Sequence, residues 1–168
     1  MTSALGAAGE VAIASLIKRA PLASSLAQSF AAQGFRLALV GGPVRDALLG
    51  RLGNDLDFTT DARPEVTKKI LQGWAENVWD TGIEFGTVAG KRGDTTVEVT
   101  TYRTESYDPD SRKPEVEYGD SIEGDLSRRD FTVNSMALEL TTKIPEFIDP
   151  FNGLEDLAKR VLRTPAKA

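Results

Sequence analysis

The chain has 168 residues, of which 40% are hydrophobic and 27% are charged, a length and composition typical of one globular domain. It has no cysteine and no histidine, which excludes disulfides, thiolate or imidazole metal ligands, and catalysis by a Ser-His-Asp triad. The formal net charge of −5 argues against a general DNA-binding domain, which would be basic.

Residues 1–35 are predicted to form a helical extension of the main body. Apolar residues suggest one short helix packed on that body: Val11, Leu16, Ile17 and Leu22. No positive charge precedes the apolar residues and Glu10 interrupts them, so a signal peptide is not expected. The apolar run at 37–40 is too short to span a bilayer. We therefore expect a cytoplasmic protein without a membrane partner.

From residue 36 onward, the patterns predict an α+β fold with a mixed sheet flanked by helices. The predicted strands are Arg36–Val40, Asp55–Thr60, Phe85–Ala89 and Thr95–Thr101. The predicted helices are Val44–Leu49, Pro64–Asn77, Phe131–Leu140 and one that begins at Leu154–Lys159. Residues 105–120 are polar and contain two prolines, which predicts a loop.

Three acidic residues fall on the predicted strands. Asp55 and Asp57 are two residues apart, so their side chains share one face, ~6.6 Å apart along the strand. Such a pair can hold two cations, and a hard cation such as Mg²⁺ suits carboxylates. Glu98 alternates with Val97 and Val99 and could complete a three-carboxylate site. Solvent-facing acids on a turn and on a one-sided sheet would give the same pattern.

Glycines and arginines supply a second set of candidates. Gly41 and Gly42 lie between a strand and a helix, where glycine lets a phosphate approach the backbone, although a plain turn would look alike. Arg45 follows one turn later and could clamp a triphosphate, or simply pair with Asp46. Arg128-Arg129-Asp130 could bind phosphate and orient a ribose hydroxyl, or merely begin the next helix, with the acid near its N-terminus.

The order of these motifs resembles that of the class II nucleotidyltransferases, the family of CCA-adding tRNA nucleotidyltransferases and bacterial poly(A) polymerases. The resemblance covers about residues 36–164. The matching blocks are VGGPVRDALLG (40–50), DLD (55–57), FGTV (85–88), EVTTYR (98–103), RRDFTVNSMA (128–137) and IDPFNGLEDL (148–157).

The resemblance implies that residues 36–168 form a polymerase-β-like nucleotidyltransferase head domain. Asp55, Asp57 and Glu98 would bind Mg²⁺ and carry catalysis. The nucleotide triphosphate would be held by Gly41, Gly42, Arg45 and Arg129. Asp130 and Asn134 would support the ribose or Arg129.

The implied activity is template-independent addition of CMP and AMP, from CTP and ATP, to the 3′ end of tRNA by a two-metal mechanism. The family's neck, body and tail domains, which select the base and grip tRNA, are absent from a chain that stops at Ala168. We therefore expect a catalytic head fragment that is weakly active or inactive and binds nucleotide with little base discrimination. A poly(A) polymerase, a non-catalytic nucleotide-binding module and a generic small-molecule-binding domain remain alternatives.

Overall fold

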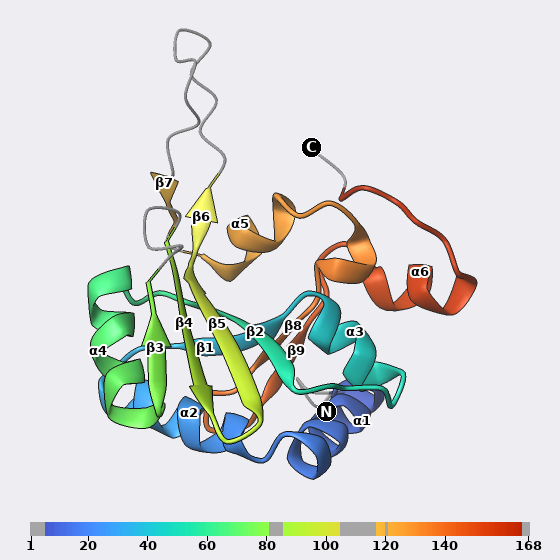
Figure 1. The fold of residues 1–168 in the computed structure, drawn as a ribbon. Helices are drawn as coiled ribbons and strands as arrows, with labels where there is room; N and C mark the ends of the chain where they lie inside the picture. Colours follow the sequence, from blue (N-terminus) through green and yellow to red (C-terminus); the bar gives the residue numbers. More distant parts are fainter. Residues whose placement is uncertain (1–5, 81–85, 105–116, 120, 166–168) are drawn as a thin grey trace, which may run out of the picture.

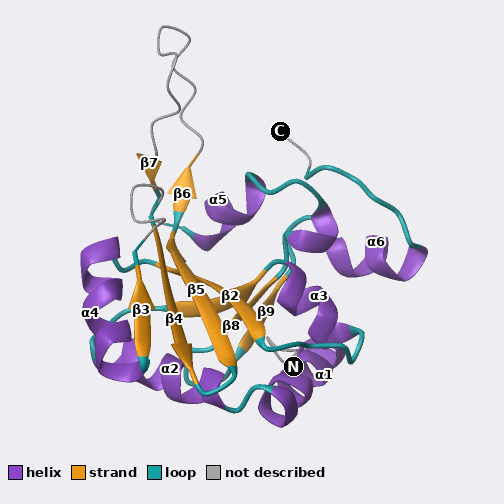
Figure 2. Cartoon of the chain, viewed as in Figure 1, coloured by secondary structure: helices purple, strands orange, loops and turns teal. Residues whose placement is uncertain are grey.

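The computed structural model describes residues 6–80, 86–104, 117–119 and 121–165 (Figure 1). A mixed sheet of seven strands lies at its centre, with helices around it (Figure 2). The strands, in their order across the sheet, are β3 (Asn77–Trp79), β4 (Thr87–Arg92), β5 (Thr95–Thr101), β2 (Asp55–Thr60), β1 (Leu37–Val40), β8 (Ala137–Glu139) and β9 (Glu146–Ile148). The predicted α+β class and mixed sheet are confirmed.

Only β2 and β5 pair in parallel; the other neighbours in the large sheet are antiparallel. A separate two-stranded ribbon is formed by β6 (Arg103–Thr104) and β7 (Glu117–Tyr118). The helices are α1 (Gly6–Arg19), α2 (Leu22–Ala32), α3 (Gly42–Leu48), α4 (Pro64–Trp74), α5 (Ile122–Ser127) and α6 (Gly153–Lys159), with a short 3₁₀ turn at Thr132–Asn134.

The N-terminal residues form two helices, not the single short helix that was expected. Pro21 separates them, because proline lacks the N–H that would continue α1. Both helices contribute to the main core: Leu16 of α1 and Phe30 of α2 are fully buried in one cluster with Phe58 of β2 and Val99 of β5. Fully burying a side chain of this kind stabilises the fold by about 1.5–3 kcal/mol.

The two faces of the sheet are covered differently. Leu56, Phe58, Val97 and Val99 belong to the main core, so the residues between them face the other way. A smaller apolar cluster covers part of that other face: Ala38, Val40, Tyr102, Ile122, Leu126 and Ala137. Two of these residues come from α5. Elsewhere on the same face, Asp55, Asp57 and Glu98 are exposed.

The prediction of a helix at Phe131–Leu140 was wrong. This segment forms a 3₁₀ turn at Thr132–Asn134 and then β8, which pairs with β1 and β9. Short apolar runs do not separate a buried strand from a helix, and here pairing on both sides favours the strand. The edge strands β3 and β9 have three residues each and were not predicted.

Some predictions lie outside the described residues. Phe85, the first residue of a predicted strand, is one of them, as are 105–116 and 120 of the predicted loop. The described end of that loop pairs with β6 as strand β7. In the part of the chain that the structure covers, we find no helix that is both long and apolar enough to cross a membrane.

Candidate active site

The three candidate carboxylates lie on one face of neighbouring strands. Asp57 on β2 and Glu98 on β5 are register partners in the parallel pair, and Asp55 pairs with Thr96 two residues earlier. All three acids are exposed, because the apolar residues that alternate with them are buried in the main core. The predicted sharing of one face is therefore present in the fold.

Electrostatics show that Asp57 is close to the other charged groups. The pKa of Asp57 is raised above its ordinary value of 3.8, first by loss of solvent around the carboxyl group and then by the negative charge of Glu98. Asp55 adds to this rise, and the positive charge of Arg129 opposes it. Glu98, Asp55 and Arg129 thus all act electrostatically on Asp57.

No three acidic side chains in the described ranges are arranged as a ready-made metal cluster. The three carboxylates share a face without converging on one point. Like charges repel, and a divalent cation would offset that repulsion. A donor set made only of carboxylate oxygens fits a hard cation such as Mg²⁺.

The glycine turn, Gly41 and Gly42, follows β1 and lies against two guanidinium groups. Gly41 has φ +74°, which favours glycine, and a Cβ there would lie 3.3 Å from Nη1 of Arg129. A Cβ on Gly42 would lie 3.2 Å from Nη2 of Arg45. The N–H of Gly41 donates to the carbonyl of Met136 (3.4 Å), so what these glycines provide is chiefly room beside the two arginines.

Arg45 is held by residues from the other end of the chain. Its Nη1 donates to Oδ1 of Asn134 (3.0 Å), and Nδ2 of Asn134 donates to Oδ1 of Asp130 (3.2 Å). Nε of Arg45 also donates to Oδ1 of the neighbouring Asp46 (3.2 Å). Asn134, held in turn by Asp130, thus supports Arg45. The support of Arg129 or of the ribose that the resemblance implies for these two residues stays a prediction.

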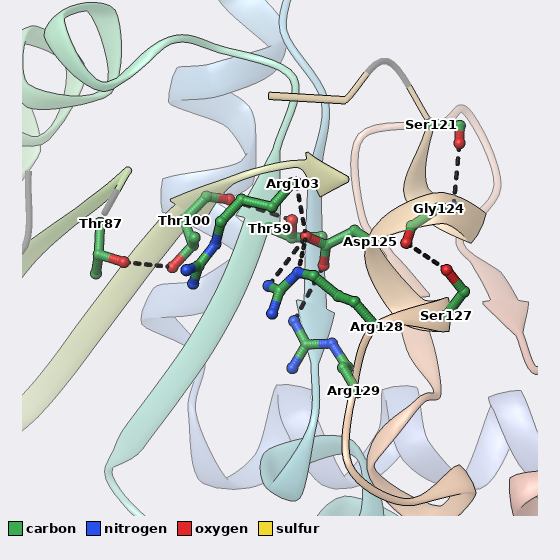
Figure 3. Close-up of polar contacts among 10 residues, drawn as sticks. All are labelled: Thr59, Thr87, Thr100, Arg103, Ser121, Gly124, Asp125, Ser127, Arg128 and Arg129. Carbon is green, nitrogen blue, oxygen red and sulfur yellow. Dashed lines mark hydrogen bonds and ion pairs between the residues drawn. The ribbon is translucent and has the colours of Figure 1, made fainter. Parts of the chain in front are cut away.

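Arg129 is supported by Asp125, which the sequence analysis did not single out. Figure 3 shows dashed contacts from the Asp125 carboxylate to the guanidinium groups of both Arg128 and Arg129. Its Oδ1 accepts from Nη2 of Arg128 (3.2 Å) and from the backbone N–H of Arg103 (3.0 Å), and its Oδ2 accepts from Nη2 of Arg129 (3.1 Å). The sequence signal for these ion pairs was that Arg128 and Arg129 lie three and four residues after Asp125, the spacing at which side chains on one helix face meet. It was missed because the arginines were expected to begin a helix, whereas they follow α5.

A cavity of about 580 Å³ opens beside Arg45, between α3 and α6. Its lining combines three arginines and one acid with apolar side chains: Arg45, Arg51, Arg160, Asp156, Leu49, Val133, Leu157, Val161 and Leu162. None of the three carboxylates is part of this lining. The acids, the glycine turn and Arg129 therefore define the candidate site better than the cavity does.

Comparison with known proteins identifies the family of this chain. Residues 37–163 match the family described as the poly A polymerase head domain. The chain belongs to this family. Its fold, an α+β mixed sheet with flanking helices, is the polymerase-β-like nucleotidyltransferase head-domain fold.

Relatives of this head domain are named CCA-adding enzymes. The chain is 50% identical over 131 residues to the CCA-adding enzyme of Streptococcus pneumoniae serotype 19F, which covers 77% of this chain and 31% of the relative. It is 47% identical over 133 residues to that of Enterococcus faecalis, covering 79% and 31%. The chain thus spans about a third of the length of the curated relatives that it matches.

Solved structures agree with this assignment. The Bacillus stearothermophilus CCA-adding enzyme in complex with CTP aligns with TM-score 0.71 and 34% identity, over 87% of this chain and 33% of that one. A tRNA nucleotidyltransferase complexed with a primer tRNA and an incoming ATP analogue aligns with TM-score 0.67 and 34% identity, over 84% and 39%.

Proposed function

We propose that this head domain catalyses template-independent transfer of CMP and AMP, from CTP and ATP, to the 3′ end of tRNA. The observation that carries the proposal is the placement of Asp55, Asp57 and Glu98 on one sheet face, with Arg129 acting on Asp57 and reaching the glycine turn. The names of the relatives and the CTP and tRNA complexes of the solved structures support the choice of substrates.

Asp55, Asp57 and Glu98 would hold Mg²⁺, which fits their oxygen donors and their mutual repulsion. When bound, Mg²⁺ lowers the pKa of the attacking hydroxyl group and neutralises charge on the departing pyrophosphate. Because carboxylates provide these ligands, the absence of histidine from the chain is compatible with the reaction.

The remaining residues would bind and orient the triphosphate. Gly41 and Gly42 leave room for its oxygens, and Arg45 and Arg129 balance its charge through planar guanidinium groups. Asn134 would keep Arg45 in place. The 3′ hydroxyl of the RNA would lose its proton to solvent, and its oxygen would form a bond to the α-phosphorus. The bond from that phosphorus to the oxygen that bridges the α- and β-phosphates would break, and pyrophosphate would leave.

Labelled CTP or ATP, incubated with Mg²⁺ and a tRNA transcript that ends before CCA, tests the proposal. We expect Mg²⁺-dependent nucleotide binding and slow addition of CMP and AMP, lost in Asp57→Asn. Asp94→Asn, which removes an exposed acid from a hairpin turn, is the matched control and should keep both.

The products separate the alternatives. Because the matched family is described as a poly A polymerase head domain, long tails made from ATP alone would favour poly(A) synthesis. Nucleotide binding that Mg²⁺ does not strengthen and that Asp57→Asn leaves unchanged would favour a non-catalytic nucleotide-binding module. Failure to bind CTP or ATP with Mg²⁺ would contradict the proposed function.

A further inference from the structure

Asp125 is a buried carboxylate with an unusual set of partners. Its side chain is 0% exposed, and it forms ion pairs with Arg128 (3.2 Å) and Arg129 (3.1 Å), whose side chains are 20% and 19% exposed. It also accepts the backbone N–H of Arg103 at the start of β6. One carboxylate from α5 therefore ties together the ribbon and both arginines.

Burying a charge is costly unless the charge is paired and hydrogen-bonded. Among the described residues, the two arginines and this N–H provide that pairing for Asp125. Two well-packed apolar residues could fill such a place without the cost of removing charges from water. A buried ion pair here therefore calls for a reason beyond stability, and the position of Arg129 supplies one.

Arg129 points from Asp125 toward the glycine turn. Its Nη2 donates to Asp125 (3.1 Å), while its Nη1 would lie 3.3 Å from a Cβ on Gly41. Its Nε is buried and, among the residues that the structure describes, has no hydrogen-bond partner. One edge of the guanidinium group is thus fixed by Asp125, and another nitrogen lies at the place proposed for the triphosphate.

We propose that Asp125 is a positioning residue, which holds Arg129 against the Gly41 turn so that its guanidinium group meets the phosphates of the incoming nucleotide. This role rests on the proposed function. An arginine side chain has many rotamers, and a fixed carboxylate partner confines it before the ligand arrives. Loss of Asp125 should therefore weaken binding of the phosphates and leave binding of the nucleoside unchanged.

Titration calorimetry with inorganic tripolyphosphate, ATP and adenosine, each with Mg²⁺, tests this role. Asp125→Asn should weaken tripolyphosphate and ATP about 10- to 100-fold, the loss expected for a hydrogen bond to a charged group, and leave any binding of adenosine unchanged. The matched control is Glu139→Gln. Glu139 is another buried carboxylate, 2% exposed, which accepts from Thr141 and lies outside the proposed site.

A double-mutant cycle separates positioning from general damage. In an Arg129→Met background, Asp125→Asn should cause little further loss of tripolyphosphate affinity, because the residue through which Asp125 acts is gone. Arg129→Met alone should reproduce most of the loss. This variant keeps the proposal testable if circular dichroism shows that Asp125→Asn does not fold.

The outcomes are distinguishable. A folded Asp125→Asn variant that binds tripolyphosphate as the wild type does would overturn the positioning role alone. Wild-type affinity in Arg129→Met would overturn it as well. A wild-type chain that binds neither ATP nor tripolyphosphate would instead contradict the proposed function, and the positioning role with it.

Discussion

Gly153, the first residue of α6, packs directly against the backbone of Thr132. A Cβ on Gly153 would overlap the carbonyl oxygen of Thr132 and come within 2.9 Å of its carbonyl carbon. The N–H of Gly153 donates to Oδ1 of Asp149 (2.6 Å), and Thr132 donates its hydroxyl to buried Asp156 (2.6 Å). This contact fixes α6 against the segment that carries Asp130 and Asn134.

Gly153→Ala is expected to destabilise the fold by about 1–3 kcal/mol, because the neighbouring group is backbone and cannot rotate away. The melting temperature should fall by roughly 2–12 °C in a thermal denaturation experiment. Gly73→Ala, in α4 with nothing within 4 Å of the added Cβ, is the control and should be neutral or slightly stabilising. Equal melting temperatures for Gly153→Ala and wild type would contradict the close contact.

Asp57→Asn is expected to stabilise the chain at neutral pH in the absence of divalent cations. The pKa of Asp57 is raised in the folded state. The stability that this group contributes is therefore fully present below the pKa that it has in the unfolded chain, and it is lost as the pH rises through the pKa that it has in the folded chain. At neutral pH the ionised Asp57 thus lowers the stability, and the asparagine removes that cost. The gain should stay below about 1 kcal/mol, since the carboxyl group is only partly removed from solvent. Scanning calorimetry with EDTA measures it.

Added Mg²⁺ should reverse that order, because a ligand that binds only the folded state raises its stability. The wild-type melting temperature should rise with Mg²⁺, and that of Asp57→Asn should change little. The same rise in both proteins would show that Asp57 is not a ligand.

As the pH is lowered, Mg²⁺ affinity should begin to fall at a higher pH than it would if Asp57 had the ordinary aspartate pKa of 3.8. The raised pKa of Asp57 means that its carboxylate is protonated at a higher pH, and only the ionised form binds the cation. Titration calorimetry over a pH series measures the midpoint. Glu98→Gln removes a negative charge that raises this pKa, so its midpoint should move to lower pH; a shift to higher pH would contradict the coupling.

Gly41→Ala is expected to strain the backbone and weaken triphosphate binding. Gly41 has φ +74°, and the new Cβ would meet Nη1 of Arg129. Gly50→Ala is a matched control, since Gly50 has φ +70° with nothing within 4 Å. Both variants should lose about 1–2 kcal/mol of stability from the left-handed backbone.

Only Gly41→Ala should bind tripolyphosphate more weakly, by about 10-fold, the loss of one charge-assisted hydrogen bond. Calorimetric titration of the two variants measures the difference. Equal affinities would mean that the turn is a plain connection, as the simpler interpretation of the sequence allowed.

Local patterns predicted the strands well where alternation was strong. In β2 and β5, apolar residues alternate with the acids, and the structure buries the first and exposes the second. Residues 131–140 lacked such a pattern. In place of the predicted helix they form a 3₁₀ turn and then strand β8, with which β1 and β9 pair. Pairing partners that are distant in sequence leave no trace in local periodicity.

By itself, the sequence determined which residues could carry chemistry and which strand face would hold Asp55, Asp57 and Glu98, since a side-chain period of two is a local property of the strand. Only the tertiary structure decided that Asn134, 89 residues away, supports Arg45. That pairing depends on the packing of distant segments, which no short window of sequence contains. The pair of Asp125 and Arg129 is local, four residues apart at the end of α5, and the structure was needed to show that α5 ends just before the arginines.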